Sequence, residues 1–442
     1  MRRVLLIGSA LLLFPYVLRA QETAPEKSSG DRVAALEERV RALEQELTAL
    51  KEALKTVAAP AAGEPGAGGA RLLLASAKLP ASIAVPGATG SATVPGPATP
   101  DPQAVQTLGG AGAAAAKALN PDISVIGDFL GAIGRNKVRP LPALELHESE
   151  VGLQAIIDPY ARGDFFLSFG ESGVNVEEGY LTFTGLPGGF VTKVGKMRAA
   201  FGKVNTIHNH ALEWTDRPLV TDNLLGGEDG INDAGLSVTR ILPAPKGIFL
   251  EVTGQVYRGD SADVFQSHRR QDVSYVAHLR GYRDITESSN MDLGFSFARG
   301  HNDIGSTFRT NLYGFDATYR WKPLRRAIYH SFLARTELVW SQRDQLSSLL
   351  TPETQRAFGF YTSAEYRLNR RWTVGGRYDR AGRARDANMM DSGFSALLTY
   401  WPSEFSQIRG QYRFTRYAEG RDANELLFQF LFVLGAHGAH PF

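Results

Sequence analysis

Apolar and polar residues alternate with period two along many short stretches between Ile123 and the end of the chain. In residues 358–368, one face carries Phe358, Phe360, Ala364, Tyr366 and Leu368, and the opposite face carries Tyr361, Ser363, Glu365 and Arg367. The same alternation recurs in residues 327–343 and 405–417. Because successive side chains of a strand point to opposite faces of its sheet, each stretch predicts a strand with one apolar and one charged face. Aromatic residues near strand ends, with arginines and carboxylates on the other face, are typical of a membrane β-barrel around an aqueous lumen.

Sixteen stretches of the chain show this pattern. They cover residues 123–131, 144–157, 161–170, 176–185, 189–197, 233–242, 246–257, 272–283, 290–300, 308–321, 328–343, 356–368, 371–382, 390–402, 405–418 and 423–434. The connections alternate between tight turns, such as 158–160 and 186–189, and generally longer polar loops. Such an asymmetry is typical of outer-membrane barrels, in which two chain ends on one side require an even number of strands. The sequence therefore predicts an all-β fold, a 16-stranded antiparallel transmembrane β-barrel, over residues 120–442.

Residues 1–20 have the pattern of a secretory signal peptide. Two arginines follow Met1, an apolar run covers residues 4–18, and Ala20 is a small residue at the expected cleavage point. An uncleaved anchor helix is the alternative, but the run is short for a helix that spans a bilayer.

Residues 31–57 carry apolar side chains at heptad spacing. These are Val33, Leu36, Val40, Leu43, Leu47, Leu50, Leu54 and Val57. Four heptads predict a self-associating α-helical coiled coil, and an amphipathic helix docked on another domain is the alternative. Residues 58–119 are rich in alanine, proline and glycine and nearly free of charge, which predicts a disordered linker.

Composition limits the classes of function. The chain has 442 residues, of which 43% are hydrophobic, and it has no cysteine. Disulfides, thiolate metal sites and thiol nucleophiles are therefore excluded. The 48 basic and 46 acidic residues give a net charge of only +2, so the chain lacks the basic surplus that nucleic-acid binding requires.

Two motifs and the last residue carry a resemblance to a known family. Residues 176–183 read Val-Glu-Glu-Gly-Tyr-Leu-Thr-Phe, and residues 194–202 read Val-Gly-Lys-Met-Arg-Ala-Ala-Phe-Gly. They resemble the passage before the third extracellular loop of sixteen-stranded trimeric porins, most closely the phosphate-selective and dicarboxylate-specific branch, some members of which carry an N-terminal coiled coil. Phe442 is similar to the terminal aromatic residue that the barrel-assembly machinery reads, and residues 426–433 are an alternative carrier of that signal.

The resemblance implies a location, an assembly and an activity. It implies a homotrimer among the lipids of the outer membrane of a Gram-negative-type bacterium. Small hydrophilic solutes or ions would diffuse passively through an aqueous barrel, and this needs no cofactor and no covalent step. Balanced charges in the barrel argue against strong phosphate selectivity, so the solute stays open.

The longest connection, residues 197–232, is the candidate constriction, because porins of this architecture fold a loop into the channel here. It carries the acids Glu213, Asp216 and Asp222. Later strands carry cations at lumen-facing positions, namely Arg280, Arg320, Arg335, Arg367, Arg377, Arg409 and Arg413. Opposed acidic and basic walls would orient and filter solutes. The alternative is that each arginine pairs with a carboxylate of the wall, such as Glu337, Glu365, Asp379 or Asp316.

Two histidine pairs are candidate metal ligands. His208 and His210 lie in the long connection with Glu213 nearby, and His437 and His440 lie at the end of the chain. Imidazole nitrogens and a carboxylate are ligands that zinc prefers, although such pairs are also ordinary polar residues of loops. A metal-linked uptake or receptor barrel is therefore one alternative function, and an envelope tether acting through the coiled coil is another. An enzyme is not expected, because no serine and histidine fall at matched height on adjacent strands.

Overall fold

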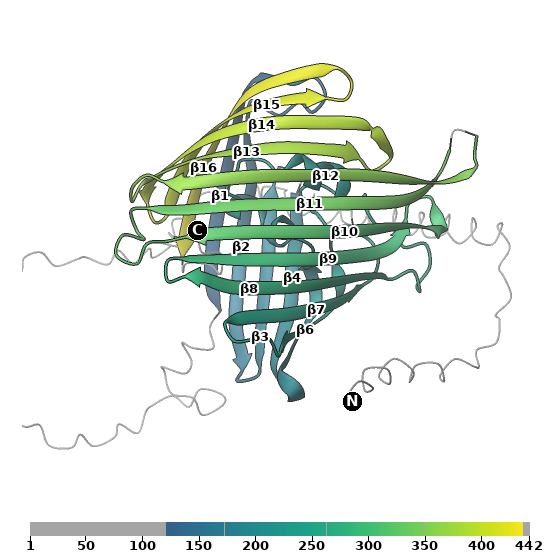
Figure 1. Cartoon of the computed structure of the whole chain (residues 1–442), viewed down its shortest axis with the longest axis horizontal. Helices are drawn as coiled ribbons and strands as arrows, with labels where there is room; N and C mark the ends of the chain where they lie inside the picture. Colours follow the sequence, from purple (N-terminus) through teal and green to yellow (C-terminus); the bar gives the residue numbers. More distant parts are fainter. Residues whose placement is uncertain (1–120, 172, 262, 348, 436–442) are drawn as a thin grey trace, which may run out of the picture. The chain divides into compact units, whose positions relative to one another are not determined.

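The computed structural model describes residues 121–171, 173–261, 263–347 and 349–435. These residues form one closed barrel of antiparallel strands, in which β1 pairs with both β2 and β16 (Figure 1). The strands are β1 (Asp122–Arg135), β2 (Leu144–Asp158), β3 (Ala161–Gly170), β4 (Gly173–Leu186), β5 (Phe190–Arg198), β6 (Asn232–Leu242), β7 (Ile248–Tyr257), β8 (Ser274–Thr286), β9 (Ser289–Asn302), β10 (Gly305–Trp321), β11 (Ser331–Leu346), β12 (Pro352–Arg367), β13 (Trp372–Arg383), β14 (Asp386–Ser403), β15 (Ser406–Tyr417) and β16 (Arg421–Gly435). The prediction of a 16-stranded antiparallel barrel is confirmed, and each strand is found with ends that differ by a few residues.

Several predictions fall on residues outside this description. They are the signal peptide over residues 1–20, the coiled coil over 31–57, the linker over 58–119, and the terminal residues His437, His440 and Phe442. They stay predictions.

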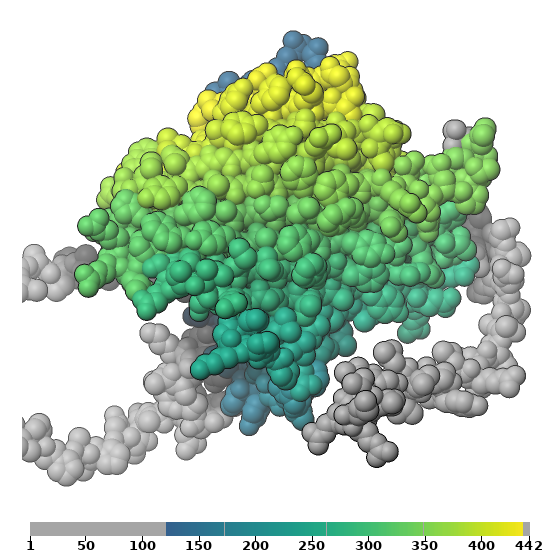
Figure 2. Space-filling model, in the orientation of Figure 1, coloured from purple at the N-terminus to yellow at the C-terminus, as the bar shows by residue number. Residues whose placement is uncertain are grey.

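The two faces of the wall differ as the alternation predicts. On β13, Arg377 and Asp379 are buried while Tyr378 between them is 41% exposed. On β14, Phe394 is 49% exposed and Ser395 is buried. In a closed barrel the buried face is the inner one, so aromatic and aliphatic side chains cover the outside. Figure 2 shows these strands packed into a continuous wall on one side of the barrel.

The connections at the two ends of the barrel differ in length less regularly than the sequence predicts. One end has mostly compact turns, including the 3₁₀ turn η1 (Pro187–Gly189) between β4 and β5, but also the longer connection 322–330. At the other end the connections 136–143, 199–231 and 258–273 are long, and the other five, such as 171–172 and 384–385, are short. The expectation of generally longer loops was therefore wrong for five of the eight connections at that end. Within the described residues, no helix has the length and hydropathy needed to cross a bilayer.

The connection from residue 199 to residue 231, which we call the inner loop, joins β5 to β6. It contains two 3₁₀ turns, η2 (Val204–Thr206) and η3 (Asn209–Ala211), and one short helix, α3 (Leu219–Leu224). The main hydrophobic core forms between this loop and the inner faces of β7 to β14. It includes Phe201, Val204, Leu212, Trp214, Val220, Leu224 and Leu225 of the loop, and Tyr257, Val276, Ala298, Leu312, Val339, Ala357, Tyr361, Ala381 and Leu397 of the wall.

The inner wall is therefore not uniformly polar, which the sequence did not predict. Two glycines give the loop room to approach. A Cβ at Gly314 would lie 3.0 Å from the ring of Phe201, and one at Gly359 would lie 2.9 Å from a methyl group of Val220. Full burial of each large apolar side chain stabilises this packing by about 1.5–3 kcal/mol.

Candidate functional site

Carboxylates of the wall hold the backbone of the inner loop. Glu337 on β11 accepts hydrogen bonds from the amides of Lys203, at 3.0 Å, and Val204, at 2.7 Å. Asp379 on β13 accepts one from the amide of Leu219 at 3.2 Å. These amides precede or begin short helical turns and have no hydrogen-bond acceptor within the turn. The wall carboxylates therefore provide the acceptors that an N-terminal capping side chain would otherwise provide. The loop thus contacts the inner face over a wide arc of the barrel.

Asp216 is the acid of the inner loop that makes the most ion pairs with the wall. Its carboxylate accepts hydrogen bonds from Arg377 at 3.0 Å, from Arg413 at 2.9 Å and from the amide group of Gln411 at 2.6 Å. Burial by itself raises the pKa of Asp216, but the two guanidinium groups outweigh it and lower the pKa to about 2. The carboxylate is therefore ionised at neutral pH, and it joins the loop to β13 and β15.

The same arginines also have partners on the wall. Arg377 donates to Asp379 at 2.7 Å, and Arg413 donates to Glu425 at 2.7 Å. The guanidinium carbon of Arg377 lies 4.9 Å from the ring centre of Trp214, a cation–π distance. The two alternatives that the sequence left open are therefore both realised, because these arginines pair with the loop and with the wall.

The other predicted lumen arginines occupy varied surroundings. Arg335 pairs with Glu213 of the loop at 2.8 Å. Arg280 donates two hydrogen bonds to Asp292, and a nitrogen of Arg320 lies 3.9 Å from the same carboxylate. Arg409 donates to the amide oxygen of Gln429 at 2.7 Å, and Arg367 lies half-buried at the last position of β12. Direct pairing thus neutralises much of the charge that the sequence places in the lumen.

Asp222, the third predicted acid, lies in α3 and pairs with Arg139 of the 136–143 connection at 3.0 Å. Both residues line a cavity of about 340 Å³ between the inner loop and the end of the barrel that carries the long connections. Arg343, Arg383 and Arg385 also line it. Because this cavity reaches the inner loop from that end, it is a candidate entrance to the lumen.

The predicted pair His208 and His210 lies in the inner loop, where both side chains are buried. Nδ1 of His208 lies 2.5 Å from a carboxylate oxygen of Glu150 and 3.0 Å from one of Glu177, and its Nε2 lies 2.8 Å from Glu178. Burial by itself lowers the pKa of His208, but the hydrogen bonds to these three carboxylates raise it well above 6.5. His208 is therefore enclosed by three acids that favour its protonated form.

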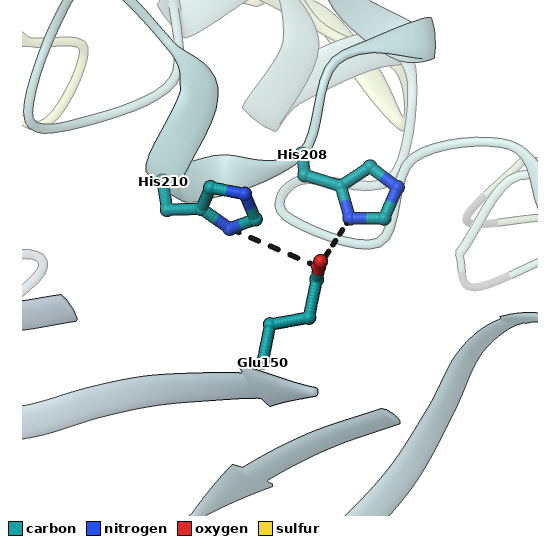
Figure 3. A group of neighbouring side chains, drawn as sticks. All are labelled: Glu150, His208 and His210. Atoms are coloured by element: carbon teal, nitrogen blue, oxygen red, sulfur yellow. Dashed lines mark hydrogen bonds and ion pairs between the residues drawn. The ribbon is translucent and has the colours of Figure 1, made fainter. Parts of the chain in front are cut away.

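His210 approaches the same carboxylate from the other side. Its Nδ1 lies 3.8 Å from Glu150, and Figure 3 shows the glutamate reaching up from β2 between the two imidazole rings of the loop. Glu213, which the sequence favoured as their partner, pairs with Arg335 instead. The carboxylates that surround the histidines come from β2 and β4.

Sequence reasoning missed the glutamates Glu148, Glu150, Glu177 and Glu178. Strict alternation cannot place neighbours such as Glu177 and Glu178 on one face. The pairing of β3 with β4 shifts register between Phe166 and Leu167, which leaves residue 177 as a bulge. The bulge turns both carboxylates inward, and a pair of adjacent acids in a strand was the only signal.

Comparisons with known proteins give one relative. No protein-family model matches the chain. An uncharacterized protein of Aquifex aeolicus is 31% identical, over 74% of this chain and 81% of the Aquifex protein.

Three solved structures share part of the backbone path. They are the outer membrane channel DcaP of Acinetobacter baumannii (12% identity, TM-score 0.49, 71% of this chain and 96% of that one), Pseudomonas putida OprB (7%, 0.48, 72% and 95%) and Salmonella typhi OmpF in complex with daunomycin (10%, 0.48, 72% and 99%). The assignment of the fold rests on the strand pairing described above and not on these likenesses.

Proposed function

The chain belongs to one family with the Aquifex aeolicus protein, and we propose that its barrel is a passive outer-membrane channel of the porin type. The observation that carries this proposal is the reversal of the two faces of the wall. Large apolar side chains such as Phe295, 56% exposed, Phe394 and Leu398 cover the outside, while charged side chains are buried inside. An apolar belt around a closed barrel is stable in lipid hydrocarbon, where every backbone group pairs within the sheet.

The inner loop narrows the passage in this proposal. Its contacts with inner-face side chains of β2, β4, β11, β13 and β15 support a path across the lumen. The remaining opening admits small hydrophilic solutes, and diffusion through it needs no cofactor and no covalent step. Because Asp216 and Glu213 pair directly with wall arginines, little free charge faces the solute. We therefore expect weak ion selectivity.

The location and assembly follow from features of the sequence. A signal peptide over residues 1–20 and an apolar barrel surface fit the outer membrane of a Gram-negative-type cell, reached through the barrel-assembly machinery. The heptads of residues 31–57 support self-association at the N-terminal ends, and the resemblance to trimeric porins favours a homotrimer. Light scattering of the full chain and of a version without residues 21–119 tests this assembly, because a clamp would be lost with those residues.

Liposome swelling tests the proposed channel directly. Vesicles that contain the folded protein should swell in isotonic solutions of small uncharged sugars, and the rate should fall steeply for trisaccharides. Vesicles prepared with heat-unfolded protein are the control. Absence of swelling with every sugar, despite confirmed insertion, would contradict a passive channel.

A further inference from the structure

The histidine cluster carries chemistry that passive diffusion does not use. Its members are Glu148 and Glu150 of β2, Glu177 and Glu178 of β4, and His208 and His210 of the inner loop, and all six are buried. Among the described residues, basic side chains near these carboxylates include His208, His210 and Arg198, the last 3.5 Å from Glu177. Four buried acids so close together are costly to ionise unless protons or cations compensate them.

One carboxylate oxygen of the cluster lacks a partner. Glu148 is 6% exposed, and among the described residues its Oε1 has no hydrogen-bond partner. Oxygen atoms of Glu148, Glu150 and Glu177 lie within 4.8 Å of one another. Buried polar atoms are nearly always satisfied, so this oxygen requires either a proton shared with a neighbouring carboxylate or a cation.

The geometry of the two imidazoles points to the class of cation. Ligand atoms of Glu150, His208 and His210 also lie within 4.8 Å of one another. In a tetrahedral site with bonds of about 2.1 Å, neighbouring ligand atoms are about 3.4 Å apart. The separations from Glu150 to Nδ1 of His208, 2.5 Å, and of His210, 3.8 Å, bracket this value. Mixed nitrogen and oxygen ligands suit zinc and neighbouring first-row divalent metals better than calcium or magnesium.

The outer nitrogen of His208 is oriented as it is in many metal sites. Its Nε2 lies 2.8 Å from Glu178, whose other oxygen accepts the backbone amide of Arg198 at 2.7 Å. A carboxylate on the far nitrogen of a ligating histidine fixes the ring and increases its basicity. The edge of the Phe166 ring lies against His208, with ring centres 5.2 Å apart, and helps to exclude water.

We propose that Nδ1 of His208, Nδ1 of His210 and a carboxylate oxygen of Glu150 bind one divalent first-row transition-metal ion, with Glu177 beside this set. A proton on Nδ1 of His208 passes to solvent when the metal takes its place, and Nδ1 moves away from the Glu150 oxygen by about 0.9 Å, from 2.5 Å to about 3.4 Å. Glu178 stays outside the ligand set and orients His208, and the free oxygen of Glu148 faces the ion. The metal ties the inner loop to β2 and β4 on the side opposite the Asp216 ion pairs. The site is independent of whether the barrel conducts.

Cobalt is the probe that separates a metal site from an imidazolium held by acids. The full chain, without an affinity tag, is extracted with EDTA, folded in detergent and titrated with Co²⁺. We expect one equivalent per chain and visible absorption bands of four- or five-coordinate Co²⁺, which added Zn²⁺ removes. His210→Ala and Glu148→Gln should each weaken binding about tenfold or more, since even partners outside the ligand set contribute 10–100-fold.

Two control variants keep the interpretation specific. His278→Ala removes another inner-face histidine, which contacts Ser296, and His437→Ala with His440→Ala removes the terminal pair. Both should bind Co²⁺ as the native chain does. The proposal is overturned if the native chain binds no equivalent, or if His210→Ala and Glu148→Gln bind as tightly as the native chain. Liposome swelling is measured in a separate experiment with EDTA present. Loss of Co²⁺ binding with normal swelling would contradict the metal site alone, and loss of swelling with normal Co²⁺ binding would contradict the channel alone.

Discussion

At the scale of single residues, Asp216 concentrates the electrostatics of the inner loop. One carboxylate meets two arginines in a place where its side chain is only 15% exposed. Charge-assisted hydrogen bonds are stronger than neutral ones, and burial protects them from screening by salt. Because Arg377 and Arg413 keep Asp379 and Glu425 as partners, removing Asp216 leaves neither arginine alone.

Asp216→Asn should destabilise the docked loop by about 1–3 kcal/mol, less than the 3–5 kcal/mol expected when a buried charge loses its sole partner. Fluorescence of Trp214, which packs against Arg377, follows undocking in denaturant, with Trp214→Phe defining its share of the signal. Asp422→Asn is the matched control, because Asp422 and Arg416 pair while 48% and 67% exposed and should contribute about 0–1 kcal/mol. Equal effects of the two substitutions would show that the loop does not depend on Asp216.

The pKa of Asp216 also sets an acid limit for the loop. Its value falls from 3.8 to about 2 in the docked state, so the carboxylate stabilises docking fully above pH 4. That contribution, about 2 kcal/mol, is lost as the pH falls from 4 through 2. In denaturant titrations followed by Trp214 fluorescence, the free energy of undocking of the native chain should be lower at pH 2 than at pH 4 by about 2 kcal/mol. Asp216→Asn should lack this difference, and equal pH dependence of the two proteins would contradict the assignment.

The residue scale shows what the sequence could and could not supply. Period-two alternation placed Arg335, Arg377 and Arg413 on the inner face, as the structure has them. Their partners could not be predicted, because pairing with Glu213 or Asp216 depends on the path of a loop without periodicity. Glu177 and Glu178 were missed because a bulge suspends the alternation on β4, and Glu148 and Glu150 follow the alternation on β2 but could not be linked to His208 without the path of the loop.

At the scale of elements, the inner loop folds as a small core against the wall. Val220 and Leu224 of α3 are buried on β12 and β13, and six residues of helix would not be stable without that contact. The sequence did not reveal the apolar stripe that receives them. The wall contributes small residues to this stripe, such as Ala357, Gly359 and Ala381. In a sequence, alanine and glycine do not show whether a position faces the lumen or the lipid.

Val220→Asp should release the loop, because Val220 is buried in the hydrophobic core and burying a carboxylate there costs several kcal/mol. We expect faster cleavage of the loop by trypsin after Lys203, which Val204 follows, and a larger single-channel conductance. Leu349→Asp is the control, since Leu349 lies in the 347–351 connection and is 83% exposed. If both properties of Val220→Asp matched those of the control, the loop would not be held by this packing.

At the scale of the whole molecule, the outward apolar surface decides the environment of the barrel. The sequence predicted the closed sixteen-stranded sheet almost completely, because pairing of consecutive strands needs only alternation and turns. It gave no register, since register depends on cross-strand contacts and bulges. The position of the belt follows from the fold, with aromatic neighbours such as Tyr378 and Phe394 paired across strands.

Phe394→Arg tests the membrane belt. Phe394 lies midway along β14, so an arginine there should destabilise the folded barrel in lipid vesicles by about 2–4 kcal/mol. Phe405→Arg, at the turn between β14 and β15, should cost only about 0–1 kcal/mol, because it lies near the interface. Folding into vesicles, followed by the mobility of unheated samples on SDS gels, measures both. Equal free energies would argue against a belt in contact with hydrocarbon.

Single-channel recording in a planar bilayer tests the central claim most directly. The folded full chain should give discrete, voltage-stable conductance steps, with a reversal potential near zero in a salt gradient because the loop and wall charges are paired. Protein that inserts as a folded barrel but gives no steps in any salt would contradict the account of a passive channel.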